Sequence, residues 1–201
     1  MLLLLNCSSG MPSFWRDRIT SFLAPAERQR LASFRFPKDR ERFLVARGGM
    51  RLLLASWRRE PLGAVVIETG PQGKPLCPGG PEFNLSHAGD LILIGLHRHR
   101  PVGVDVEFRF PEEEWRSIAE LVLSAEECQA LNLLPKEKQR EAFLASWCRL
   151  EARLKARGTG LSGLGRLHAE PSPRNVAGRE EIWDLILPPG YSGAAACTGV
   201  S

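Results

Sequence analysis

The stretch Val102-Gly-Val-Asp-Val-Glu107 has the pattern of a half-buried β-strand. Successive side chains of a strand point to opposite faces, so the three valines share one face and Asp105, Glu107 and Gly103 share the other. The valines predict a buried face. Two neighbouring carboxylates beside a glycine are typical either of a solvated acidic face, which the pattern alone favours, or of a site for a hard divalent cation.

Downstream, Lys136 to Arg157 is predicted as the longest helix of the chain. It contains the segment Trp147-Cys-Arg-Leu-Glu-Ala-Arg-Leu-Lys155. Glu151 and Lys155 are four residues apart and therefore lie on one face of the helix. Either they form an ordinary exposed ion pair, worth about 0.3–0.5 kcal/mol, while Trp147 anchors the helix in the core, or they belong to a site.

Upstream lies Phe83-Asn-Leu-Ser-His-Ala-Gly-Asp90, preceded by Gly73-Lys-Pro75. Ser86 and His87 are on a turn-prone segment, where they would either cap the backbone or bind a phosphate. A serine hydrolase site is not favoured, because the chain has no GxSxG elbow.

Periodicity and capping signals predict the remaining elements. Helices are expected over residues 25–34, 37–59 and 112–123, and a capping box at Ser124 with Glu127 would start another. Strands are expected over residues 1–5, 64–68, 91–97, 181–187 and 193–198, with 91–97 joined to 102–107 as a hairpin. Gly48 and Gly49 interrupt the second helix at a cost of about 1 kcal/mol each, so we expect a close backbone approach there or two shorter helices.

The composition is that of an ordinary globular protein. Hydrophobic residues make up 43% and charged residues 25% of the 201 residues, which argues against disorder. The formal net charge of +4 favours an anionic partner, such as nucleic acid, a phosphate-rich cofactor or an acidic protein. Because the chain lacks an aromatic–basic RNA motif and a zinc pattern, we do not expect nucleic acid to be the partner.

Cysteine usage and the amino terminus bear on location. The five cysteines are scattered and never spaced as CxxC, which argues against a disulfide framework and a zinc site and predicts a cytoplasmic protein. The apolar start, Met1 to Leu5, is too short to cross a bilayer and lacks the features of a secretory signal, so we expect a strand there and no membrane partner.

Four motifs occur in an order and spacing that resemble the 4'-phosphopantetheinyl transferase superfamily. That family carries GKP, then FN(L/I)SHS, then (I/V)G(I/V)D(I/V)E, then a helix with W-x-x-KE-(A/S)-x-x-K-x-x-G-x-G-L. The corresponding segments here are residues 73–75, 83–87, 102–107 and 147–161. The amino-terminal helices and the chain length are similar to those of the larger, Sfp-type branch.

This resemblance implies an α/β (α+β) fold of two similar lobes in a pseudo-twofold arrangement, each a small, mostly antiparallel sheet packed with helices. We expect the lobes to comprise residues 1–107 and 108–201. We also expect a monomer that binds coenzyme A and magnesium in the cleft between the lobes.

The activity implied is transfer of the 4'-phosphopantetheine arm of coenzyme A to a serine of an apo acyl or peptidyl carrier protein, with release of 3',5'-ADP. By similarity, Asp105, Glu107 and Glu151 would be the Mg²⁺ ligands. Lys155 would be a phosphate clamp or the acid that assists departure of the leaving group. The serine proton would pass to Glu151 or to a metal-bound water beside Glu107, and the sequence leaves both open.

The family also suggests where the substrates bind. The residues matched to coenzyme A phosphate contacts are Lys74, Ser86 and His87, with Arg30 and Arg47 added through the helix alignment. The carrier protein would dock near residues 108–123. The segment carries three acidic residues, Glu112 to Glu114, and an apolar stripe of Trp115, Ile118, Leu121 and Val122. This stripe either binds the carrier or packs its helix on the core.

Three features depart from the family pattern. Gly48 and Gly49 stand where the family usually has bulky residues between two arginines. Leu150 stands where the family usually has lysine, and Ala88 replaces the usual serine after the histidine. Arg153 and Arg157 lie near the helical face of Leu150 and would be the cations to replace that lysine. The alternative function is a catalytically impaired homologue that binds coenzyme A or carrier protein without transfer, and Leu150 is its only motivation.

Overall fold

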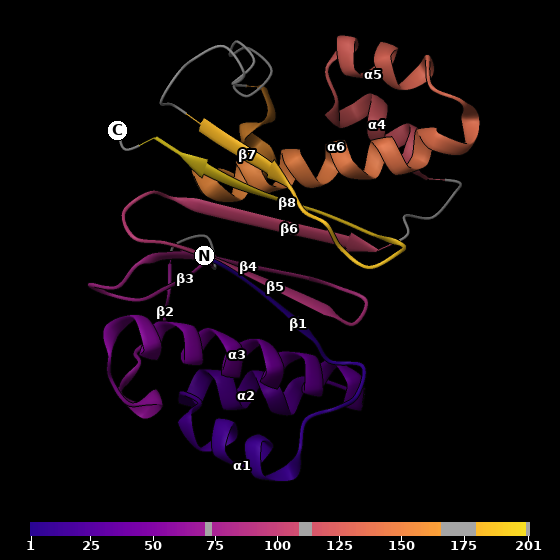
Figure 1. The fold of residues 1–201 in the computed structure, drawn as a ribbon. Helices are drawn as coiled ribbons and strands as arrows, with labels where there is room; N and C mark the ends of the chain where they lie inside the picture. The colour runs from indigo at the N-terminus through magenta and orange to yellow at the C-terminus, as the bar shows by residue number, and fades with distance from the viewer. Residues whose placement is uncertain (71–73, 109–113, 166–179, 200–201) are drawn as a thin grey trace. The chain divides into compact units, whose positions relative to one another are not determined.

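The computed structural model describes residues 1–70, 74–108, 114–165 and 180–199 (Figure 1). The chain divides into two compact units, Met1–Arg98 and His99–Ser201. This division falls before the expected boundary at residue 107, because strand β6 (Val102–Phe108) pairs with strand β8 (Tyr191–Thr198) and so belongs to the second unit. Among the described residues, no helix has both the length and the apolar character needed to cross a membrane.

The first unit is a three-stranded antiparallel sheet packed with helices. The sheet has the order β1-β5-β4, and a separate two-stranded ribbon is formed by β2 and β3. Its elements are β1 (Leu2–Asn6), α1 (Ser13–Phe22), α2 (Pro25–Ser33), α3 (Pro37–Arg58), η1 (Leu62–Ala64), β2 (Glu68–Thr69), β3 (Pro75–Leu76), β4 (Glu82–Ala88) and β5 (Leu91–His97).

Helix α3 runs through Gly48 and Gly49 without interruption over 22 residues. A Cβ atom at Gly48 would collide with Ile19 of α1, and one at Gly49 would collide with Leu5 of β1. The two glycines therefore let α3 lie close to both neighbours, which is the close approach that the sequence led us to expect. Met50 follows directly and is 1% exposed, so the apolar face of the helix continues into the core.

The second unit repeats this plan with a 22-residue helix on a three-stranded antiparallel sheet of order β6-β8-β7. Helix α6 lies between this sheet and helices α4 and α5 (Figure 1). The elements are α4 (Trp115–Val122), α5 (Ala125–Asn132), α6 (Lys136–Arg157), η2 (Gly160–Gly163), β7 (Glu180–Asp184), β8 and β6. The predicted fold class is confirmed, since each unit is a small antiparallel sheet packed with helices.

A glycine sets the distance between α6 and its sheet. Cys148, Ala152 and Ala156 recur every fourth residue on α6 and are buried against the small residues of β8. Gly103 of β6 lies so close to α6 that a Cβ atom there would collide with the backbone of Ala152 and Ala156. The sequence had suggested that a cation could bind beside Gly103. The backbone of α6 fills the space next to this glycine.

The prediction of a hairpin between residues 91–97 and 102–107 is wrong. Strand β5 pairs with β1 and β4, whereas β6 pairs with β8, so the two segments belong to different sheets. The predicted strand over 64–68 is also largely wrong: Leu62–Ala64 is a 3-10 helix and β2 begins only at Glu68. Helix α1 was not predicted, and it contains no buried residue that would give it a clear apolar period.

Gly103→Ala is expected to lower the free energy of unfolding by about 1–3 kcal/mol, because the added methyl group meets the helix backbone, which cannot rotate away. Chemical denaturation measures the loss. Gly165→Ala is the matched control, since a Cβ atom there meets nothing within 4 Å. Equal stability of the two variants would contradict the close contact between β6 and α6.

Candidate active site

Carboxylates from β6 and α6 lie beside one lysine in the second unit. The Nζ atom of Lys155 is 2.6 Å from Oδ1 of Asp105 and 4.0 Å from Oε2 of Glu151. Trp147 lies on α6 four residues before Glu151. Its indole Nε1–H donates a hydrogen bond of 3.3 Å to Oε1 of Glu107. The structure thus brings together Asp105, Glu107, Glu151 and Lys155, which the sequence had assigned to one site.

The spacing of the two motifs explains this alignment. Four residues of an α-helix and two residues of a β-strand both advance by roughly 6 Å. Trp147, Glu151 and Lys155 therefore form a row on α6 whose single step is similar to the step from Glu107 to Asp105 on β6. Trp147 and Lys155 are two such steps apart, about 12 Å, so their long side chains span the difference. The two rows run in opposite directions, since Trp147 contacts Glu107 and Lys155 contacts Asp105.

Burial and mutual repulsion shape the electrostatics of this row. Burial raises the pKa of Glu107, and the nearby charge of Asp105 raises it further. Burial also raises the pKa of Glu151. The charge of Lys155 lowers this pKa, and the charge of Asp105 raises it. Asp105 is 2% exposed and Lys155 29%, so the ammonium is the more accessible member of the pair. A partly solvated cation beside carboxylates can bind a phosphate without leaving the site.

The buried thiol of Cys148 lies behind the carboxylates. Burial raises its pKa strongly, and the charges of Asp105 and Glu107 act in the same direction. The thiol donates to the backbone oxygen of Ser192 at 3.4 Å. Cys148 is therefore a neutral packing residue under the site rather than a nucleophile.

The donor set suits a hard cation, although the side chains do not converge on one point. Among the described residues, no group of three or more His, Cys, Asp or Glu side chains is arranged closely enough to hold a metal ion. Mg²⁺ is commonly held by one or two carboxylates together with substrate phosphates and water, so a complete protein cage is not required. The charge of Asp105 acts on both Glu107 and Glu151 and raises the pKa of each.

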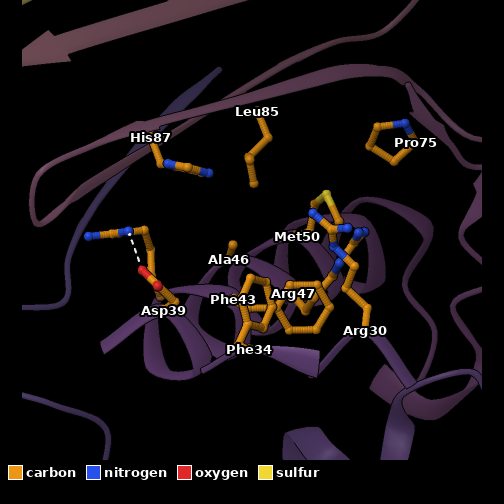
Figure 2. Close-up of a pocket in the computed structure, with 11 residues that line it drawn as sticks. Arg30, Phe34, Asp39, Phe43, Ala46, Arg47, Met50, Pro75, Leu85 and His87 are labelled. Atoms are coloured by element: carbon orange, nitrogen blue, oxygen red, sulfur yellow. Dashed lines mark hydrogen bonds and ion pairs between the residues drawn. The ribbon is translucent and has the colours of Figure 1, made fainter. Parts of the chain in front are cut away.

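A second group of predicted residues lines a pocket of about 370 Å³ in the first unit. Arg30 and Arg47 lie on one side of this pocket, and His87 faces them from β4 (Figure 2). The guanidinium of Arg47 lies 5.1 Å from the centre of the Phe43 ring, and that of Arg30 lies 5.6 Å from the Phe34 ring. Aromatic walls with cationic groups suit a ligand that combines a flat ring with phosphates.

Glu27 contacts the cationic side of this pocket. Its Oε1 atom is 3.3 Å from Nε of Arg47, and its Oε2 atom is 2.9 Å from Nη2 of the buried Arg51. The same carboxylate accepts a hydrogen bond from the backbone of Ala24, so it ties the start of α2 to α3. Burial lowers the pKa of Arg47, and the Glu27 charge opposes that shift.

Ser86 and Lys74 are not lining residues of the pocket. Strand β4 runs from Glu82 to Ala88, so adjacent side chains alternate, and the buried Ser86 points to the opposite face from His87. The turn-prone segment of the sequence is therefore a regular strand. The Nζ atom of Lys74 lies 4.0 Å from Oε2 of Glu82, and burial lowers the pKa of Lys74. Its neighbour Pro75 does line the pocket, while Gly73 lies outside the described residues.

Leu150 is a core residue and does not face solvent. It is 6% exposed and packs in a cluster with Trp115, Phe143 and Leu154. The two arginines suggested as replacements for a lysine there are held elsewhere, because Glu180 pairs with both of them. Its oxygens lie 2.9 Å from Nε of Arg153 and 3.2 Å from Nε of Arg157.

Most of the apolar stripe proposed for carrier binding packs on the core. Trp115 and Val122 of α4 are buried, whereas Leu121 is 78% exposed. The preceding residues 109–113, which include two of the acidic residues of that segment, lie outside the described residues. The core-packing interpretation therefore holds for Trp115 and Val122.

Comparison with known proteins relates both units to one superfamily. Residues 101–183 match the family model described as the 4'-phosphopantetheinyl transferase superfamily, and residues 12–98 match that of the 4'-phosphopantetheinyl transferase amino-terminal region. The match over residues 12–98 lies within the first compact unit, and the match over residues 101–183 lies within the second. The chain belongs to the 4'-phosphopantetheinyl transferase superfamily.

Several curated relatives carry the name 4'-phosphopantetheinyl transferase. HetI of Nostoc sp. is 30% identical over 152 residues, covering 72% of this chain and 64% of the relative. AcpT of Salmonella typhi is 40% identical over 108 residues, covering 53% and 55%. The psf-1 protein of Bacillus pumilus is 38% identical over 104 residues, covering 51% and 43%. The chain thus spans between 43% and 64% of the length of these relatives.

Sequence reasoning missed two contributions to these sites. Trp147 was assigned to the core, yet its indole N–H reaches Glu107. Its position four residues before Glu151 is the signal that would have found it, because this spacing repeats between Glu151 and Lys155. Phe43 was not among the predicted site residues, and nothing in its spacing indicates that it lies under Arg47.

Leu150→Lys is expected to lower the free energy of unfolding by about 2–4 kcal/mol, because it places an ammonium in an apolar cluster. Leu150→Met, which nearly keeps the volume, should cost less than about 1.5 kcal/mol. Urea denaturation compares the two variants. A lysine variant as stable as the methionine variant would show that position 150 is open to solvent.

Proposed function

We propose that this chain transfers the 4'-phosphopantetheine arm of coenzyme A to a serine of an apo acyl or peptidyl carrier protein, releasing 3',5'-ADP. The observation that carries the proposal is the row of Asp105, Glu107, Glu151 and Lys155 across β6 and α6. Membership of the superfamily supports it, because the same motifs that define the family build this row.

Asp105, Glu107 and Glu151 are the residues that would hold Mg²⁺, together with oxygens of the coenzyme A pyrophosphate. When bound, the ion would neutralise the charge of the pyrophosphate and so favour attack on phosphorus. The chemistry of the donor set supports this assignment. Lys155 already carries a positive charge beside Asp105 and Glu151, and it would add a second neutralising group for the phosphates.

The transfer forms one bond and breaks one bond at phosphorus. The Oγ atom of the carrier serine attacks the phosphorus that bears pantetheine, and the bond from that phosphorus to the bridging oxygen breaks. The bridging oxygen leaves with 3',5'-ADP, stabilised by Lys155. The serine proton passes to Glu151 or to a water beside Glu107, the two acceptors that the motifs offer.

The pocket of the first unit is the proposed site for the nucleotide part of coenzyme A. Arg30, Arg47 and His87 would contact its phosphate groups, and the rings of Phe34 and Phe43 would contact the flat base. Lys74 and Ser86 are further proposed phosphate contacts that rest on their motif positions alone.

The proposed setting is a cytoplasmic monomer with a carrier protein as its protein partner. The five cysteines are free, which suits a reducing compartment. The carrier class follows from the family, and the acidic helices typical of carriers would favour the basic residues of this chain. Carriers of fatty acid, polyketide and nonribosomal peptide synthases are the candidate partners.

An apo acyl carrier protein incubated with the chain, coenzyme A and Mg²⁺ is expected to gain the mass of one phosphopantetheine arm. EDTA should abolish the gain, and Asp105→Asn should slow it by on the order of a hundredfold, because even partners of metal ligands are commonly worth 10–100-fold. Intact-mass spectrometry measures both. Coenzyme A binding without transfer to any apo carrier would instead support the catalytically impaired homologue.

Arg47→Ala is expected to weaken coenzyme A binding by roughly tenfold or more, because hydrogen bonds to charged groups are worth about 1.5–3 kcal/mol. Isothermal titration calorimetry with coenzyme A measures this loss. Arg35→Ala is the control: this exposed arginine lies on the ring of Phe36 and does not line the pocket. Equal affinities for the two variants would place coenzyme A outside the pocket.

A further inference from the structure

Trp147 belongs to the helix motif and has no role in the proposed chemistry. Its ring packs toward Phe143, at 6.4 Å between ring centres, on the edge of the cluster under α4 and α5. A tryptophan that only filled this cluster would need no polar partner. Instead, its Nε1–H points at the carboxylate of Glu107, with 3.3 Å between nitrogen and oxygen.

Glu107 differs from the other carboxylates in how it is held. Asp105 is fixed by its 2.6 Å contact with Lys155, and Glu151 lies on the rigid helix that carries this lysine. Glu107 lies next to the last residue of β6, and it has a longer side chain than Asp105. Its carboxylate therefore has more rotational freedom to lose on binding a ligand than the buried Asp105.

We propose that Trp147 is a positioning residue, which uses its indole N–H to hold the Glu107 carboxylate in the orientation that binds Mg²⁺. This inference rests on the proposed function, because it takes Glu107 to be a metal ligand. The indole is suited to this task, since it donates one hydrogen bond in a fixed direction and its ring is anchored in the core. Partners that orient metal ligands in this way commonly contribute 10–100-fold to metal affinity.

Trp147→Phe keeps an aromatic ring against Phe143 and removes the N–H donor together with part of the indole ring system. In the presence of coenzyme A, the variant is expected to bind Mg²⁺ on the order of tenfold more weakly by isothermal titration calorimetry. Its affinity for coenzyme A in EDTA should be unchanged. Trp115→Phe is the matched control, because it also loses an indole beside Phe143, at 5.7 Å, and should keep the Mg²⁺ affinity.

Three outcomes separate the possibilities. An equal loss of Mg²⁺ affinity in both variants would assign Trp147 to packing and overturn the inference. Unchanged affinity in Trp147→Phe, with normal binding by the unsubstituted chain, would overturn the inference and leave the proposed function standing. No Mg²⁺ binding by the unsubstituted chain with coenzyme A would overturn both.

A second measurement does not depend on the folding of Trp147→Phe. In ¹H–¹⁵N spectra, the assigned indole signal of Trp147 should shift in Glu107→Ala, which removes the acceptor, and should also shift when Mg²⁺ is added with coenzyme A. The indole signal of Trp115 should stay in place in both experiments. A Trp147 signal that does not respond to Glu107→Ala would show that the hydrogen bond is absent in solution.

Discussion

The second unit depends on the close contact between Gly103 of β6 and the backbone of α6. Because Gly103 has no side chain, Ala152 and Ala156 come against the strand without an intervening layer. At this distance, the short side chain of Asp105 reaches Lys155. A larger residue at position 103 would move the helix outward and separate the carboxylates of β6 from those of α6, so packing and chemistry here share one constraint.

The polar row is held in place by apolar contacts on both of its sides. The small residues of α6 pack on β8, and Leu150 and Leu154 pack toward α4 and α5. Between these layers the carboxylates are close enough for burial and the Asp105 charge to raise the pKa of Glu107. Such an arrangement opposes folding when the carboxylates are ionised, and a buried core on each side supplies the compensating stability.

Much of the fold was predictable because it depends on local patterns. The bounds of α6 and the capping box of α5 follow from residues within a few positions of one another. The pairing of β6 was not predictable in this way: its partner, β8, lies some ninety residues along the chain, and a short loop favoured the wrong hairpin. The strand containing Ser86 and His87 was hidden by its turn-forming residues, although β-sheet pairing with β5 overrides those preferences.

The sequence by itself determined which side chains share a face. The strand period places Asp105 with Glu107, and the helix period places Glu151 with Lys155, because both depend only on backbone geometry. The tertiary structure decided that these two faces meet, that Trp147 reaches Glu107, and that Leu150 is buried instead of facing a phosphate. Those facts depend on packing between segments distant in the chain, and no local period encodes which surfaces come into contact.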